Sequence, residues 1–122
     1  MSHPAQVISR KTESAIAEHL IAAVGTEPRG ATLATGTNTP IGVCIQPGAC
    51  EVGDVIDIVE VGTADVLCGG SVAAGDIVGA DATGKAVKAT SGVALGIALE
   101  AGAEGDVIEV RVCPHAVTAP TA

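Results

Sequence analysis

The alternation of apolar and polar positions is clearest near the end of the chain. Residues 106–113 place branched apolar side chains at every second position, with charged ones between them: Ile108, Glu109, Val110, Arg111 and Val112. This period of two predicts a β-strand with one buried and one solvated face. Similar short runs, bounded by turn residues, predict strands at residues 30–34, 41–45, 54–61, 64–68, 76–80, 85–89, 94–99 and 106–113, with a turn after each.

One unit of this pattern occurs twice. Residues 42–62 and 96–112, aligned on their Gly-Asp pairs, place Ile56 over Ile108, Asp57 over Glu109 and Ile58 over Val110. The leading Gly42 and Gly96 also align, after a gap of two residues. The chain therefore repeats a structural unit, a duplicated hairpin, rather than a catalytic motif.

Three Gly-Asp pairs precede branched apolar residues, and they are Gly53-Asp54, Gly75-Asp76 and Gly105-Asp106. Catalytic carboxylates are one interpretation. Turn chemistry is the better one, because glycine accepts a positive φ and aspartate bonds nearby backbone N–H groups. Residues 81–86 similarly predict a hairpin tip, with Asp81 at the first turn position and Gly84 in the left-handed conformation.

The beginning of the chain is less regular. Within residues 12–24, Ile16, Leu20 and Val24 have helical spacing and Thr12 could cap a helix, yet residues 19–24 also suit a strand. The local pattern does not decide between them. Residues 1–11 have no period that would bury one face, and they are interpreted as an extended N-terminal arm, with a frayed terminus as the alternative.

Composition supports an all-β fold in one domain. The 122 residues include sixteen glycines and six prolines, typical of many short strands and tight turns. We therefore expect a small glycine-rich β-barrel or β-sandwich of short antiparallel strands over residues 12–122. The chain has no Phe, Tyr or Trp, so its core is thin, and the mean hydropathy of +0.50 favours further burial between subunits.

The charge excludes several partners. The formal net charge is −8 with only six Lys and Arg, which argues against nucleic-acid binding. Neither a signal-peptide core nor an apolar run of about 20 residues is present. We expect a soluble protein without a membrane partner, made in the cytoplasm, where cysteines normally stay reduced.

Candidate chemistry is sparse, and we expect no enzyme, cofactor or metal site. Cys113 and His115 are the one close nucleophile and base, but no third group orients the base. His3 and His19 are scattered. The four cysteines, Cys44, Cys50, Cys68 and Cys113, lack paired zinc spacing and are expected to be small buried hydrophobes, although their even number leaves a disulfide open.

Lys85 suggests a second class of function. Lipoyl and biotinyl carrier domains are small β-sandwiches of two similar halves with a modified lysine at a hairpin tip. Those families place an acidic residue or methionine directly before the lysine, whereas Lys85 follows Thr83-Gly84. The carrier function is therefore the weakest alternative.

Residues 66–89, "VLCGGSVAAGDIVGADATGKAVKA", followed by residues 94–112, "ALGIALEAGAEGDVIEVRV", resemble the capsid cement or head decoration proteins of tailed bacteriophages. A Gly-Gly step, "AAGD", a "DADGKA"-like turn and a closing "GxAxxxAxxGDxxxV" occur in the family's order. The resemblance covers roughly residues 40–113. The four cysteines and the segment "TESAIAEH" depart from the family pattern, which puts subunit contacts there in doubt.

The resemblance implies a β-rich protein on the outside of an assembled phage capsid, commonly a homotrimer at threefold or quasi-threefold positions, with the major capsid protein as partner. It also favours an extended strand over residues 16–24. We hypothesise that the arm adds a strand to an exposed capsid edge through Ser2, His3, Pro4, Ala5, Gln6, Val7 and Ile8. A tail or fibre component is the alternative assembly role.

Overall fold

The computed structural model describes residues 6–89 and 92–117, and these contain strands and no helix. The strands are β1 (Gln6–Thr12), β2 (Ile16–Ala17), β3 (Ile21–Val24), β4 (Gly30–Leu33), β5 (Pro40–Cys44), β6 (Ala49–Cys50), β7 (Val55–Leu67), β8 (Ile77–Ala80), β9 (Ala86–Lys88), β10 (Gly92–Ala98) and β11 (Val107–Val117). The all-β prediction is confirmed. The described residues therefore also contain no helix that is long and apolar enough to cross a bilayer.

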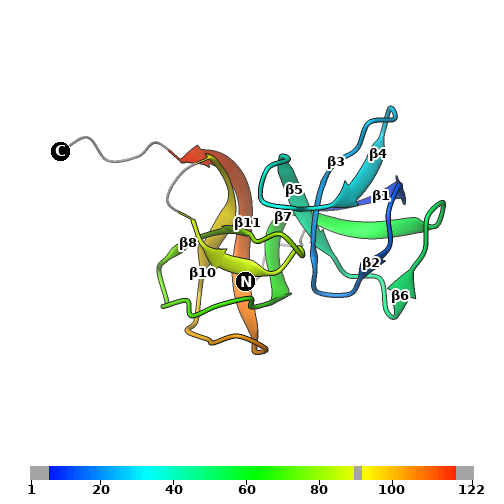
Figure 1. The fold of residues 1–122 in the computed structure, drawn as a ribbon. Coiled ribbons are helices and arrows are strands. Elements are labelled where there is room, and N and C mark those ends of the chain that lie inside the picture. Colours follow the sequence, from blue (N-terminus) through cyan, green and yellow to red (C-terminus); the bar gives the residue numbers. More distant parts are fainter. Residues whose placement is uncertain (1–5, 90–91, 118–122) are drawn as a thin grey trace.

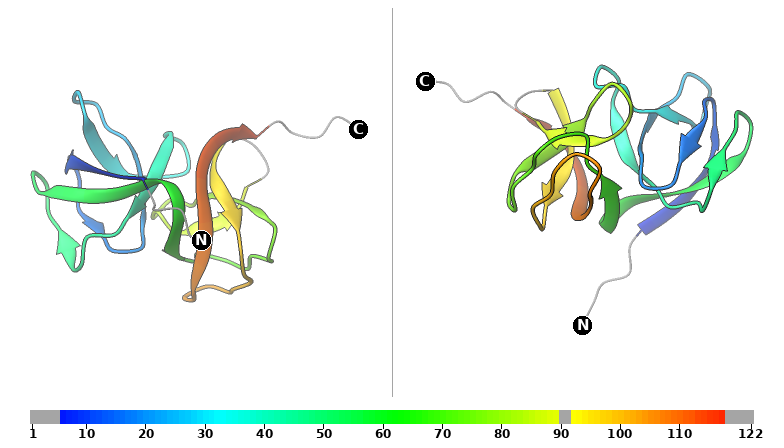
Figure 2. Two further views of the ribbon diagram at one scale, coloured as in Figure 1. Left: turned by 180° about the vertical axis from the view of Figure 1, so that it is seen from behind. Right: turned by 60° about the horizontal axis from the view of Figure 1, so that its bottom comes forward.

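The strands form two lobes that share β7 (Figure 1). In the first lobe, β1, β4, β3, β5 and β7 follow one another, and the pairing of β1 with β7 closes them into a barrel. In the second lobe, β7 continues into a sheet of order β7-β11-β10-β8-β9. Figure 2 shows the lobes side by side from two further directions, with β7 passing from one to the other.

The continuity of β7 differs from the prediction of two strands separated by a turn. Val55–Val61 pair with β1, and Gly62–Leu67 pair with β11. Gly62 has a φ of 123°, a backbone conformation that favours glycine. The glycine therefore allows the strand to leave one sheet and enter the other without a chain reversal.

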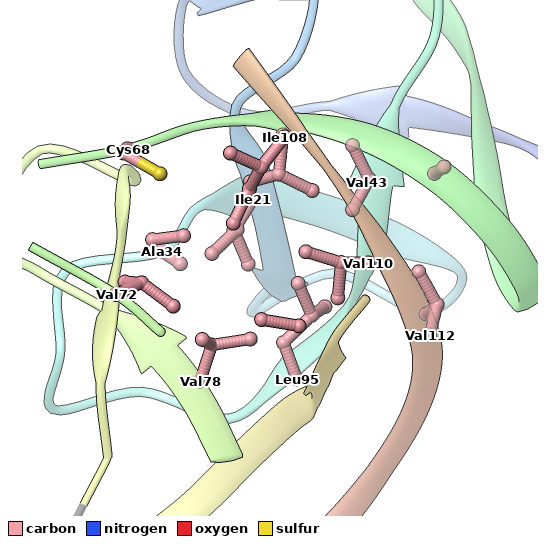
Figure 3. Packing of buried hydrophobic residues seen from close by; sticks show 14 of the residues in the cluster. Ile21, Ala34, Val43, Cys68, Val72, Val78, Leu95, Ile108, Val110 and Val112 are labelled. Atoms are coloured by element: carbon pink, nitrogen blue, oxygen red, sulfur yellow. The ribbon is translucent and has the colours of Figure 1, made fainter. Parts of the chain in front are cut away.

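Two apolar cores are built from alternating residues of the same strands. Ala22, Cys44 and Ile58 point into the barrel, where Ile16 and Cys50 of the small β2–β6 sheet join them. Their neighbours Ile21, Val43 and Val59 point the other way and pack against the second sheet. Figure 3 shows this shared core, in which Ile21 and Val43 of the barrel meet residues of the second lobe such as Val78, Leu95 and Val110.

The three Gly-Asp pairs are turns, as predicted. Gly53, Gly75 and Gly105 have φ values of 94°, 90° and 91°. In each turn the aspartate carboxylate accepts a hydrogen bond of 2.9 Å from the backbone N–H three residues earlier, on Glu51, Ala73 and Ala103 respectively. The carboxylates therefore hold the chain at the start of a strand.

The hairpin tip at residues 81–86 is also confirmed. It joins β8 to β9, Gly84 has a φ of 80°, and one Asp81 carboxylate oxygen accepts hydrogen bonds from the backbone N–H groups of Thr83 and Lys85. Desolvation raises the pKa of Asp81, but these hydrogen bonds outweigh it and hold that pKa below its ordinary value.

The ambiguous residues 12–24 contain no helix, and the strand that the resemblance favoured over residues 16–24 is confirmed in part, because a turn at residues 18–19 divides it into β2 and β3. β3 buries Ile21 and Ala23 in the shared core and Ala22 in the barrel, so this segment uses both faces, which a helix with one apolar stripe would not. The chain reverses between β2 and β3 at His19, whose φ is 74°.

The predicted N-terminal arm over residues 1–11 is wrong for residues 6–11. Gln6–Lys11 are paired with β7 and belong to the barrel. The side-chain pattern does not reveal this strand, because Gln6–Ser9 are exposed and bury no apolar face. β1 closes the barrel through its backbone pairing with β7.

Candidate functional site

The first candidate surface is the edge of β1. One edge of this strand pairs with β7 over Gln6–Lys11, whereas on the other edge only Lys11 and Thr12 pair with β4. Gln6–Arg10 therefore present an edge that no described strand covers. Unpaired backbone N–H and C=O groups on such an edge are a template for another extended chain.

Side chains hold β1 in place and leave its apolar residues accessible. Arg10 donates to Glu60 through Nε at 3.1 Å and Nη2 at 3.0 Å, and the Ser9 hydroxyl donates to Asp57 at 2.7 Å. Val7 is 46% exposed. Next to the ion pair lies an open recess of about 470 Å³, lined by Arg10, Thr39, Pro40, Ile41, Glu60, Val61, Val93 and Pro114.

The structure describes part of the predicted contact set. Gln6, Val7 and Ile8 lie in β1, at the end of the open edge. Ser2, His3, Pro4 and Ala5 lie outside the described residues. The prediction had these seven residues in one arm, and the structure instead gives the last three a partner strand within the molecule.

The second candidate surface, which we call the outer face, is the side of the second sheet turned away from the shared core. Thr63, Arg111, Ile97 and Ile77 form one row across four strands, because each lies directly opposite the next. In the adjacent row Asp65 lies opposite Glu109, and Leu99 donates its backbone N–H to Glu109. The alternation of residues 108–112 predicted the solvated position of Glu109 and Arg111, whereas nothing in the sequence singled out Ile77 and Ile97.

Three of the four thiols are packed in the apolar cores. Cys44, Cys50 and Cys68 are buried in the two cores without a disulfide, which confirms that they act as small hydrophobes. Desolvation raises the pKa of the Cys44 and Cys68 thiols, so the reactive thiolate is disfavoured. Cys113 is half-buried, and the side chain of His115 lies outside the described part.

The histidines and carboxylates of the described residues do not gather into a set of three or more that could hold a metal ion. His19 has a structural contact instead, since its Nδ1 lies 3.1 Å from the carbonyl oxygen of Asp65. His3 lies outside the described residues. A recess of about 340 Å³ between residues 36–40 and the β8–β10 strands has Lys88 as its one charged lining residue.

Lys85 is poorly placed for a swinging arm. Its hairpin is tucked against the barrel, because Gly84 accepts a hydrogen bond of 2.8 Å from the N–H of Ile21, and a Cβ on Gly84 would meet Leu33. Lys85 itself is half-buried. A carrier lysine must reach a distant active site, so this packing argues against that alternative.

Comparisons with known proteins show a fold relationship to a solved structure. No family model matches the chain, and no curated protein matches it. Among solved structures, the chain is similar to the head fiber gp8.5 N base of bacteriophage phi29, with a TM-score of 0.70 and 17% sequence identity over 90% of this chain and 95% of that one. At this identity the similarity shows a shared fold, which extends over both lobes.

Proposed function

We propose that this chain is a structural protein of a bacteriophage virion that binds the exterior of the assembled head and stabilises the shell. The observation that carries the proposal is the fold shared with the base of a phage head fiber over 90% of this chain. The motifs in residues 66–112 that resemble head decoration proteins support the same location. The shared fold and the sequence resemblance together support a location on the phage head.

The proposed role needs no catalytic step and no cofactor. The carboxylates of Asp54, Asp76 and Asp106 are engaged in turns, and the buried thiols fill cores. The described side chains leave no buried polar atom without a hydrogen-bond partner. Chemistry-bearing residues are therefore used to build the fold, as expected of a structural protein.

The proposed partner is the major capsid protein, bound through the edge of β1 together with Ser2–Ala5. An extended capsid segment that pairs with Gln6–Arg10 would continue the barrel sheet outward, with main-chain hydrogen bonds supplying affinity. Val7, 46% exposed, would lie beside the added strand. In the sequence-based hypothesis the arm adds a strand to an edge of the capsid protein. Here β1 stays paired with β7, and its open edge accepts a strand from the capsid protein.

We further propose a homotrimer at threefold or quasi-threefold positions. Several weak contacts from one trimer raise the avidity when all bind at once. Because the trimer would bind the assembled shell and not separate capsid subunits, it would stabilise the shell by mass action. Eleven exposed Val, Ile and Leu side chains on so small a body favour such association.

The test is binding to purified heads that lack the protein. A variant without residues 2–5 keeps β1 intact, and Val7→Lys places a charge beside the open edge, which opposes strand pairing. Each is expected to reduce occupancy on heads at least about tenfold in co-sedimentation. Val24→Lys is the matched control, because Val24 is 53% exposed on another barrel strand and should bind as the unmodified protein does.

Failure of the unmodified protein to bind heads would reject the proposed function. Normal occupancy of both altered proteins would reject the contact mode and keep the function. Cryo-electron microscopy of decorated heads then gives the location of each subunit and its symmetry.

A second candidate function is the base of a head fibre, because the structurally similar phi29 protein is the base of one. In that role the chain would also sit on the head but would anchor a projecting protein. Micrographs separate the two roles, since a shell coat gives density at many lattice positions, whereas a fibre base gives a projection from each occupied site.

A further inference from the structure

We propose that the outer face of the second sheet is the surface through which copies of this chain associate, with Arg111 of one copy contacting Asp65 and Glu109 of the next. This inference rests on the self-association in the proposed function and gives it a surface and an orientation.

The outer face is unusually apolar for a solvated sheet face. A sheet covered on one side normally carries polar side chains on the other. Here Ile77 and Ile97 are each 36% exposed and lie directly opposite each other on β8 and β10, and the neighbouring Leu99 is 42% exposed. Contiguous exposed apolar side chains of this kind mark an interaction surface.

The charges of the outer face are unbalanced. Asp65 and Glu109 lie directly opposite each other on β7 and β11, and like charges at such positions destabilise a sheet. Glu100 adds a third carboxylate, which accepts a hydrogen bond of 2.8 Å from the N–H of Glu109. Arg111 lies one row away and makes no ion pair within the described part of the molecule.

A second copy of the chain can supply an arginine for the carboxylates of the outer face and carboxylates for its arginine. The same face carries a surplus of carboxylates and an exposed arginine, so copies arranged head to tail can place each Arg111 against the carboxylates of the next. Three such faces around a threefold axis satisfy all three pairs and cover Ile77, Ile97 and Leu99. With a net charge of −8 opposing association elsewhere, this contact also determines the relative orientation.

The test is sedimentation velocity of the full-length protein without heads, over a range of concentrations. Arg111→Glu is expected to raise the dissociation constant at least about tenfold, because it replaces an attraction by a repulsion. The combined variant D65R/E109R/R111E exchanges the charges on both sides of the contact and is expected to restore association. Ile97→Lys tests the apolar part and is also expected to dissociate the assembly.

Arg29→Glu is the control, since it makes the same change of net charge at an exposed turn of the barrel and should leave association unchanged. The inference is overturned if the unmodified protein is monomeric, if Arg111→Glu associates normally, if Arg29→Glu weakens association equally, or if the exchanged charges do not restore it in a folded protein. Binding to heads is measured separately. Assembled protein that does not bind heads rejects the proposed function and keeps this inference. A monomer that binds heads rejects this inference and the proposed homotrimer, but keeps the proposed binding to the head.

Discussion

The two copies of the repeated unit fold alike but are covered differently. In both, the leading glycine lies against a carbonyl group of the opposite strand, Val59 for Gly42 and Arg111 for Gly96. In both, a Gly-Asp turn starts the second strand. The middle of the β5–β7 hairpin is packed on both faces, by the barrel core and by the second sheet. The β10–β11 hairpin is packed on one face only.

The difference shows that the repeat specifies a hairpin and not its surroundings. Ile58 and Val110 are aligned, and both are fully buried. On the opposite faces, Val59 of the first copy is buried, whereas its aligned residue Arg111 is exposed. An arginine at the position of a buried valine leaves this face of the second copy open to solvent or to a partner.

The largest expected effect comes from alanine at the two aligned glycines. A Cβ at position 42 or 96 would overlap a backbone carbonyl oxygen, so each substitution should destabilise the fold by about 3 kcal/mol. Gly42→Ala should lower the free energy of unfolding more than Gly96→Ala does, because the hairpin of Gly42 is packed on both faces and cannot shift. Gly70→Ala is the control, since its Cβ would find its nearest atom at 3.6 Å.

Chemical denaturation of the three variants measures these free energies of unfolding. A larger loss for Gly96→Ala than for Gly42→Ala would contradict the role assigned to the covering lobe.

Alanine at the turn aspartates should have a smaller effect. Asp54→Ala and Asp106→Ala each remove one hydrogen bond of 2.9 Å to the backbone, at a cost of about 1 kcal/mol. Asparagine at the same positions retains an acceptor oxygen and should recover most of the loss. Equal losses in the two copies, measured by denaturation, would show that the turns are equivalent; no loss in either would refute their structural role.

The smallest effect is a pH dependence that belongs to the barrel lobe. The Glu13 carboxylate accepts hydrogen bonds from the N–H groups of Thr26 and Glu27, and these lower its pKa. The contribution of Glu13 to the free energy of unfolding is fully present above the ordinary glutamate pKa. It is lost as the pH falls through the lowered pKa of Glu13 in the folded protein. Glu13→Gln should flatten the dependence of the denaturation midpoint on pH in this acid range.

Glu104→Gln, at an exposed residue of the other lobe, serves as the control for Glu13→Gln. An unchanged pH profile in Glu13→Gln would mean that this carboxylate does not hold the turn at residues 25–30.

The sequence predicted what depends on near neighbours. The Gly-Asp turns, the Asp81 hairpin tip and the alternation of residues 108–112 are local, and the structure confirms them. The predicted break between residues 61 and 64 was wrong, because whether Gly62 turns or bends a strand depends on the two sheets that flank it. The strand at Gln6–Lys11 was missed for a related reason, since its pairing with β7 joins segments about fifty residues apart.

The candidate surfaces were predicted less well than the fold. The open edge of β1 is a property of backbone pairing, which side-chain patterns do not report. The Ile77–Ile97 pair exists only because β8 and β10 adopt one particular register. The sequence predicted a thin core for this aromatic-free chain. The structure builds two cores from small side chains, because β3, β5 and β7 bury residues on both faces.

The shared strand β7 makes the two lobes interdependent. A protease cut near Gly62 would leave one fragment without the strand that closes its barrel and the other without the first strand of its sheet. Each fragment would also lose the apolar wall that the other supplies. We expect heat to melt the intact chain in a single cooperative transition, with the halves unable to persist apart.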